Sequence, residues 1–179
     1  NSNGDRIGWR RKNVQDQGAR IVTTSYESSK KKEEKEYLLV DGYNIIFAIP
    51  ELKELAEVNI DSARDRLKDL LCNYQGFKKN TLILVYDAYK VEGGTGSVEK
   101  YHNIHVVYTK EAETADQYIE KTVHEIGKKY HVTVATSDAL EQKIIWGAGA
   151  SRLSAKGLWE ELEAIRKEIK EQYLDKPNG

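Results

Sequence analysis

The stretch YLLVDGYNIIF, residues 37–47, begins with an uninterrupted apolar run and places an aspartate, Asp41, where that run ends. A short run without polar positions is typical of a strand that is buried on both faces of a sheet. Three runs of the same kind follow in the chain, TLILVY at 81–86, IHVVY at 104–108 and VTVA at 132–135. We therefore expect four buried strands, the first of which ends in a carboxylate.

Helical spacing separates these strands. Apolar residues recur every three or four positions over 63–74, after Asp61 as the expected N-cap, and over 115–130 after Thr114. A third stripe of this kind, over 158–173, lies near the end of the sequence. Strands that alternate with helices form parallel sheets covered on both faces. We therefore predict an α/β fold, a three-layer α/β/α sandwich with a mainly parallel central sheet.

Charge and composition divide the chain into segments. Of the 179 residues, 39% are hydrophobic and 32% are charged, which suits one globular domain with residues to spare. Residues 1–36 hold nine Lys and Arg against six Asp and Glu, a net charge of +3, without an apolar period. Because the whole chain carries −1, the remainder carries −4. We predict a basic, irregular linker or tail over 1–36, the domain over 37–174 and a disordered tail over 175–179.

Several classes of protein and site lack support in the sequence. No apolar run approaches the ~20 residues that span a bilayer, and no signal-peptide pattern opens the chain. The single cysteine, Cys72, excludes an internal disulfide and suits a reducing compartment, so we expect a cytoplasmic protein. Dinucleotide-binding, P-loop and nucleophile-elbow motifs are absent, and the four histidines do not form a zinc set. The sequence GAGAS at 147–151 predicts a bend before a short strand.

Acidic residues follow the predicted strands. Asp41 ends the first strand, Asp87 follows the second and Asp138 follows the fourth, while Asp116 lies at the start of the helix after the third. Open parallel sheets bind ligands beyond the carboxyl ends of their strands, so we expect these carboxylates in one crevice. Gathered carboxylates raise each other's pKa unless a cation neutralises them, and hard divalent ions prefer oxygen ligands. The sequence therefore predicts a Mg²⁺ or Mn²⁺ site.

Structural explanations compete with this interpretation at single positions. Asp116 lies where a negative charge stabilises a helix N-terminus, and Ser137 or Asp138 could cap a helix that begins near residue 139. Asn44 could cap a short helix or orient a metal-bound water as a neutral oxygen donor. These alternatives remain open on the sequence.

Five segments together resemble the YacP-type branch of the NYN family, whose members are metal-dependent ribonucleases with a PIN-like fold. The segments are LLVDGYNIIFA, LVYDAYKV, VVYTKEAETADQYIE, VATSDALEQ and GAGASRLSAKGLWEEL, and the resemblance covers residues 37–172. It implies that Mg²⁺ or Mn²⁺ is held by Asp41, Asp116 and Asp138. It further implies that the catalytic site comprises Asp41, Asn44, Asp87, Asp116 and Asp138, with Glu113 and Ser137 behind the ligands.

The resemblance also implies an activity and partners. We expect an endoribonuclease that hydrolyses mRNA in association with the ribosome and has no membrane partner. Lys90, Lys110 and Arg152 are candidates for contacts with the RNA backbone, although basic residues in such loops are more often solvated surface. Tyr43 is a candidate for stacking on a base, and core packing explains it equally well. Similar domains follow translation-factor GTPases of the ribosomal-protection type. Because the chain has no Met and opens with NSNGDRIGWRRKN, we expect such an upstream domain.

Two other functions compete with RNA hydrolysis. One is a non-catalytic PIN-like module that binds RNA or the ribosome, such as the C-terminal domain of a ribosomal-protection-type GTPase. The other is a phosphatase or small-nucleotide hydrolase that uses the same sheet edge. The acid set favours an enzyme over a binding module, because binding RNA gives no reason to concentrate negative charge.

Overall fold

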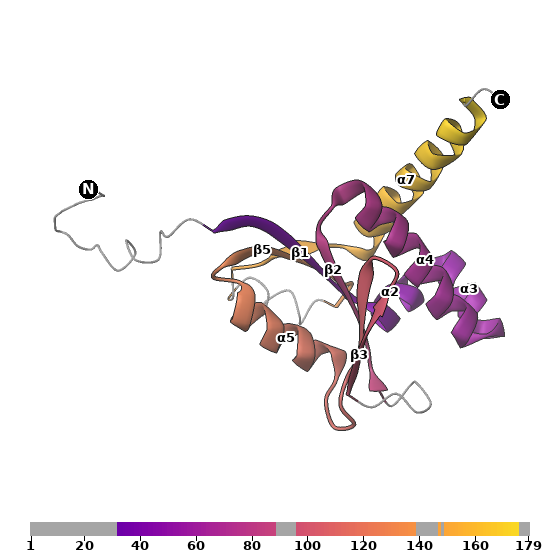
Figure 1. Ribbon diagram of the computed structural model, residues 1–179. Helices are drawn as coiled ribbons and strands as arrows, with labels where there is room; N and C mark the ends of the chain where they lie inside the picture. The colour runs from indigo at the N-terminus through magenta and orange to yellow at the C-terminus, as the bar shows by residue number, and fades with distance from the viewer. Residues whose placement is uncertain (1–31, 89–95, 139–146, 148, 176–179) are drawn as a thin grey trace, which may run out of the picture. The chain divides into compact units, whose positions relative to one another are not determined.

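The computed structural model describes residues 32–88, 96–138, 147 and 149–175 (Figure 1). In chain order, its strands and helices are β1 (Glu33–Asp41), α2 (Gly42–Ala48), α3 (Pro50–Val58), α4 (Ile60–Lys78), β2 (Thr81–Tyr86), β3 (Ser97–Tyr101), β4 (Ile104–Tyr108), α5 (Ala115–Ile126), β5 (Tyr130–Ala135), β6 (Ser151–Leu153) and α7 (Ala155–Asp175). No helix within the described ranges is both long and apolar enough to cross a membrane.

The described strands form one six-stranded sheet in the order β3-β4-β2-β1-β5-β6. The pairs β1–β2, β2–β4 and β5–β6 are parallel, whereas β3 pairs with β4 in the antiparallel direction. The chain moves outward from β1 through β2 to β4 and then, after α5, continues as β5 on the other side of β1. The strand order therefore reverses beside β1, where open α/β sheets form a crevice at their carboxyl ends.

Each face of the sheet carries its own hydrophobic cluster. Leu38 and Val40 of β1 belong to the larger cluster, whereas Leu39 between them belongs to the smaller one. This division follows from the alternation of side chains along a strand, and it explains why no position of YLLV is polar.

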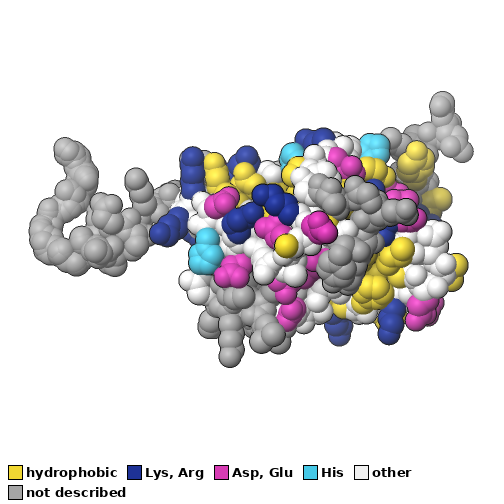
Figure 2. Space-filling view, turned by 90° about the horizontal axis from the view of Figure 1, so that it is seen from below, with side chains coloured by type: hydrophobic (Ala, Val, Ile, Leu, Met, Phe, Trp, Pro, Cys, Tyr) yellow, Lys and Arg dark blue, Asp and Glu magenta, His cyan; other side chains and the backbone are white. Residues whose placement is uncertain are grey.

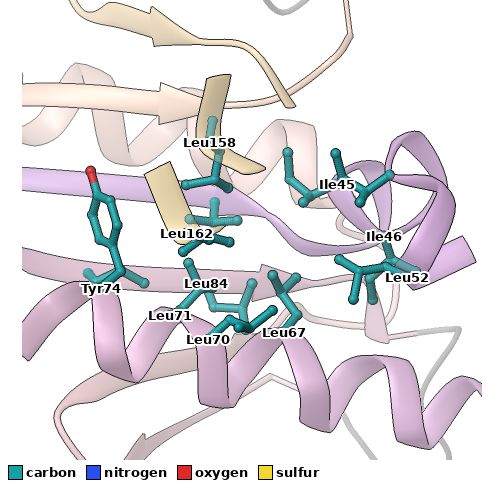
Figure 3. Close-up of a cluster of buried hydrophobic side chains, with 14 of the residues drawn as sticks. Ile45, Ile46, Leu52, Leu67, Leu70, Leu71, Tyr74, Leu84, Leu158 and Leu162 are labelled. Carbon is teal, nitrogen blue, oxygen red and sulfur yellow. The ribbon is translucent and has the colours of Figure 1, made fainter. Parts of the chain in front are cut away.

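Helices cover both clusters. On the larger one, Figure 3 shows Leu67 and Leu71 of α4 beside Leu158 and Leu162 of α7. On the smaller one, the stripe of α5 packs against β1, β2, β4 and β5 (Figure 1). The predicted α/β/α sandwich with a mainly parallel sheet is confirmed.

The predicted helix boundaries need two corrections. Asn59, not Asp61, caps α4: its Oδ1 accepts a hydrogen bond from the Asp61 amide at 2.9 Å, so Asp61 lies in the first turn. Thr114 caps α5 as predicted, but the helix ends at Ile126. Tyr130, which continues the helical spacing, begins β5, and its ring packs 5.1 Å from that of Tyr37. The sequence period alone does not reveal this change of element.

Other elements lacked an apolar signal. β1 begins at Glu33, ahead of the predicted start at Tyr37. The early start was missed because Glu34, Lys35 and Glu36 are charged and exposed. β3 at the sheet edge is exposed along most of its length, and it was not predicted. The helices α2 and α3 were also missed. The apolar stripe predicted over 158–173 extends beyond the buried part of α7, since Tyr173 is 80% exposed.

Candidate active site

Asp41 stands at the junction of β1 and α2. It is the last residue of the strand and the N-cap position of the helix, yet its side chain accepts no capping hydrogen bond. The residue is only 4% exposed. Gly42 follows directly, and a Cβ at that position would collide with the ring of Tyr86 and crowd the carbonyl of Val85. The absence of a side chain at Gly42 therefore lets α2 begin close against β2 and keeps Asp41 at the end of the sheet.

Asp87 connects the end of β2 to the start of α5. Its Oδ1 accepts a hydrogen bond from the backbone amide of Ala115, the first residue of α5, at 2.6 Å. The N-terminal end of a helix favours negative charge, so this contact stabilises the carboxylate where it stands. The same contact fixes the first turn of α5, which carries the half-buried Asp116. Asp87 thus positions Asp116 relative to the strand ends.

Thr109 reinforces this connection from the end of β4. Its hydroxyl accepts a hydrogen bond from the amide of Ala88 at 3.1 Å and donates one to the carbonyl of Glu113 at 2.7 Å. The side chain is almost completely buried. A buried hydroxyl with both hydrogen bonds satisfied holds its neighbours firmly, so the ends of β2 and β4 and the lead-in to α5 form one unit.

Asn44 ties α2 to the chain that leaves β5. Its Oδ1 accepts hydrogen bonds from the Ser137 amide at 2.5 Å, from the Ser137 hydroxyl at 2.8 Å and from the Thr136 hydroxyl at 3.2 Å. The Thr136 hydroxyl in turn accepts one from the amide of Asp138 at 3.0 Å. Asn44 lies inside α2, so it does not cap that helix. Because its oxygen is fully engaged, Asn44 orients the segment that carries Asp138 and offers no oxygen to a metal.

These contacts bring the four aspartates into one pocket. The pocket has a volume of about 390 Å³ and is lined by Asp41, Tyr43, Asn44, Phe47, Ala48, Asp87, Asp116, Ser137 and Asp138. None of the described residues that line it is Lys, Arg or His. Four carboxylates without a basic side chain among them form a donor set that suits a hard divalent cation.

The chemistry of this donor set fits Mg²⁺ or Mn²⁺, but the side chains are not yet arranged as a closed coordination shell. Within the residues that the structure describes, no three His, Cys, Asp or Glu side chains converge closely enough to hold an ion. Mg²⁺ usually keeps several waters and takes only one or two carboxylates, so a loose acidic pocket suits it better than a tight cage.

The other predicted residues lie in different environments. Glu113 does not line the pocket, and its carboxylate pairs with the ammonium of Lys121 at 3.1 Å. Lys110 is exposed and Arg152 half-buried in β6, and neither lines the pocket. Lys90 lies outside the described residues. Tyr43 lines the pocket but is only 3% exposed, and its hydroxyl accepts a hydrogen bond from Arg64 at 3.0 Å, as packing predicts.

Phe47 lines the same pocket and was not singled out on the sequence. Phe47 is 47% exposed, although it lies at the end of an apolar run whose pattern predicts a buried residue. The sequence feature that could have identified Phe47 is its position four residues after Tyr43. In a helix that starts at the strand end, this spacing places both rings on the same side.

Comparison with known proteins identifies the family. The model of the YacP-like NYN domain matches residues 38–178. The chain belongs to this family. It is 42% identical over 149 residues to the uncharacterized protein YacP of Bacillus subtilis (strain 168), covering 79% of this chain and 86% of that protein.

Solved structures of another YacP-like NYN protein share the fold. The crystal structure of Rae1 (YacP) from Bacillus subtilis is 41% identical, with a TM-score of 0.67, over 76% of this chain and 79% of that one. A mutant of Rae1 gives a TM-score of 0.66 at 40% identity, over 76% and 80% of the two chains. The match therefore covers most of both YacP-like NYN chains.

Proposed function

We propose that this domain is a metal-dependent endoribonuclease that hydrolyses phosphodiester bonds of RNA. The observation that carries the proposal is the pocket in which Asp41, Asp87, Asp116 and Asp138 meet without a basic side chain among the described lining residues. Membership of the YacP-like NYN family supports it, since the fold is of a nuclease type. The class of reaction is metal-assisted hydrolysis, which requires no covalent intermediate on the protein.

Asp41, Asp116 and Asp138 are the residues that would hold Mg²⁺ or Mn²⁺. When bound there, such an ion would lower the pKa of a coordinated water and neutralise charge on the phosphate. The chain's own contribution is positioning. Asp41 is fixed by the β1–α2 junction, Asp116 by the bond from Asp87 to α5, and Asp138 by the tether through Asn44.

Electrostatics point to a need for a larger scaffold. The residues after position 36 carry a net charge of −4, which repels RNA in the absence of cations. On the face shown in Figure 2, Lys and Arg side chains are interspersed with Asp and Glu among the coloured residues. We propose that the domain acts on mRNA in association with the ribosome, which supplies the affinity that the domain lacks.

A non-catalytic RNA-binding or ribosome-binding module is the competing function. The lack of a ready three-ligand group within the described residues favours it. The concentration of carboxylates in a pocket favours the enzyme, because a docking surface for RNA gains nothing from negative charge.

Cleavage assays separate these functions. The 179-residue chain is incubated with single-stranded RNA, with DNA of the same sequence and with a mononucleotide, in Mn²⁺ or EDTA, with and without ribosomes. We expect RNA to be cleaved, and DNA and the mononucleotide to remain intact. Cleavage should occur in Mn²⁺ but not in EDTA, and Asp41→Asn should abolish it. Hydrolysis of the mononucleotide would indicate a phosphatase instead. RNA binding without cleavage under every condition, ribosomes included, would leave the binding module as the better account.

A further inference from the structure

An exposed aromatic ring stands in the acidic pocket. Phe47 lies in the last turn of α2 and is 47% exposed, although it lines the same pocket as the four aspartates. The exposed large hydrophobic side chains of the described residues are Phe47, Val58, Phe77, Val98, Tyr173 and Leu174. Within this set, Phe47 alone lines the acidic pocket. A phenyl ring that is partly exposed beside the carboxylates presents an apolar face on which a flat ligand can pack.

The ring of Phe47 packs against the ring of Tyr43. The two rings stack with centroids 6.4 Å apart and an angle of 22° between their planes. Tyr43 is held in turn by the hydrogen bond that its hydroxyl accepts from Arg64, which also pairs with Asp61. Phe47 therefore rests on a ring that is fixed by a hydrogen bond and is presented by a helix.

Buried aromatic packing continues beneath this pair. Tyr43 packs against Tyr86 at 4.9 Å between centroids, and Tyr86 against Tyr108 at 6.0 Å. Tyr86 is completely buried, and its hydroxyl donates a hydrogen bond to the carbonyl of Arg64 at 3.3 Å. Because Phe47 packs on this buried, hydrogen-bonded ring, it should lose little conformational freedom when a flat ligand stacks on it.

The pocket's charge restricts the chemistry of that ligand. The described residues that line it offer four carboxylates and no basic group, so a phosphate gains no direct attraction from these side chains. An unpaired nucleobase, in contrast, has a flat apolar face that stacks on any aromatic ring, whatever its sequence. A base adjoining the reacting phosphate would thus gain from Phe47 the affinity that the carboxylates cannot supply.

We propose that Phe47 is the stacking platform for the nucleobase beside the scissile phosphate. This inference rests on the proposed function and deepens it, because it makes unpaired RNA the substrate class. A base inside a duplex is stacked and paired on both sides, so it must be extruded before its face can reach the ring.

Two substitutions of Phe47 and one control test the proposal. Phe47→Leu removes the ring and keeps an apolar side chain, whereas Phe47→Trp keeps an aromatic face. Phe77→Leu is the matched control, because Phe77 is 42% exposed on α4 and does not line the pocket. We expect Phe47→Leu to raise KM for single-stranded RNA about tenfold with kcat nearly unchanged, since stacking is made equally in the ground and transition states. Phe47→Trp and Phe77→Leu should keep the wild-type KM.

An abasic substrate shows whether the lost contact is with a base. Single abasic nucleotides are placed in turn along the RNA, and KM is measured for wild type and Phe47→Leu. One abasic position should raise KM of the wild type about as much as Phe47→Leu does, and it should add nothing in the variant. Equal effects of every abasic position in both proteins would overturn the stacking role and leave an apolar protein partner as the occupant.

Failure of the stacking role is distinguishable from failure of the nuclease. The same variants are made in an Asp41→Asn background, and binding of labelled single-stranded RNA is measured by fluorescence anisotropy with Mn²⁺ present. About tenfold weaker binding on loss of the ring supports the platform even if the wild type cuts no RNA. In this binding assay, RNA binding that is undetectable, or that does not change on loss of the ring, overturns the stacking role of Phe47. In an active enzyme, an unchanged KM of Phe47→Leu overturns it.

Discussion

The Oδ1 atom of Asn44 accepts a hydrogen bond from the backbone amide of Ser137 at 2.5 Å, which joins the helix after β1 to the chain leaving β5. These residues are 93 positions apart in the sequence, and the bond closes the pocket across the point where the strand order reverses. Two hydroxyl donors converge on the same oxygen. The side-chain amide of Asn44 therefore holds the segment that carries Asp138 against α2.

The first prediction concerns this tether. Asn44→Ala leaves the Ser137 amide and two hydroxyls without their acceptor, so we expect a loss of about 1–3 kcal/mol in the free energy of unfolding. Asn73→Ala is the control, because Asn73 is an exposed residue of helix α4 and should change stability by less than about 0.5 kcal/mol. Urea denaturation measures both. Equal small effects would mean that the tether contributes nothing to the fold.

The second prediction concerns Gly42. Gly76 is the control, because substitution by alanine there should change stability in the opposite direction. A methyl group at Gly42 would collide with the buried ring of Tyr86, so Gly42→Ala should destabilise the protein by about 1–3 kcal/mol. Gly76 lies inside α4, where an added methyl group would meet open space, so Gly76→Ala should stabilise by about 0.5–1 kcal/mol through helix propensity. Thermal melts that moved in the same direction would contradict this assignment.

The buried strands and the acids that follow them were predictable because the signal is local. An apolar run marks a strand between two covered faces, and the next polar residue must lie at its end, as Asp41 and Asp87 do. The parallel direction of the strands then places those ends along one edge of the sheet. The fold class and the grouping of the aspartates follow from these two steps.

The directions of individual side chains were not predictable, because they depend on contacts between distant segments. In TKEAETADQ, the Thr114 cap places Asp116 in the first turn of α5, whereas Glu113 precedes the cap and turns to Lys121. Tyr43 and Phe47 share one side of α2, yet Tyr43 is buried by Arg64 and Tyr86 and Phe47 remains exposed. The sequence does not encode these contacts at short range.

The third prediction concerns pH. Burial lowers the pKa of His105 below its usual value, and the charges of Lys100 and Lys35 add to the effect. The unfolded chain therefore binds a proton at this residue more readily than the folded protein, so its contribution to stability is complete above about pH 6.5 and is lost as the pH falls through the folded pKa. His105→Gln should be less sensitive than wild type when urea midpoints at about pH 7.5 and about pH 5.5 are compared. Identical pH dependence of both proteins would exclude His105 as its source.

The fourth prediction tests the metal site without relying on catalysis. An ion that binds only the native state stabilises it in proportion to the logarithm of its concentration, by about 2.7 kcal/mol at one hundred times the Kd. Wild type should therefore melt at increasing temperatures as Mn²⁺ is added. Asp41→Asn should gain much less, because it removes one of the four carboxylates of the pocket.

Without metal, Asp41→Asn should have a higher melting temperature than wild type. Carboxylates confined to one pocket repel each other, so removing one charge should raise the melting temperature of Asp41→Asn above that of wild type in EDTA. Asp65→Asn is the control: Asp65 lies on α4, 67% exposed and paired with Lys68, and its loss should leave the gain from Mn²⁺ unaltered. If wild type and Asp41→Asn gain equally from Mn²⁺, Asp41 is not a ligand. Its charge at the end of β1 would then need an explanation other than metal binding, since its side chain makes no capping bond to α2.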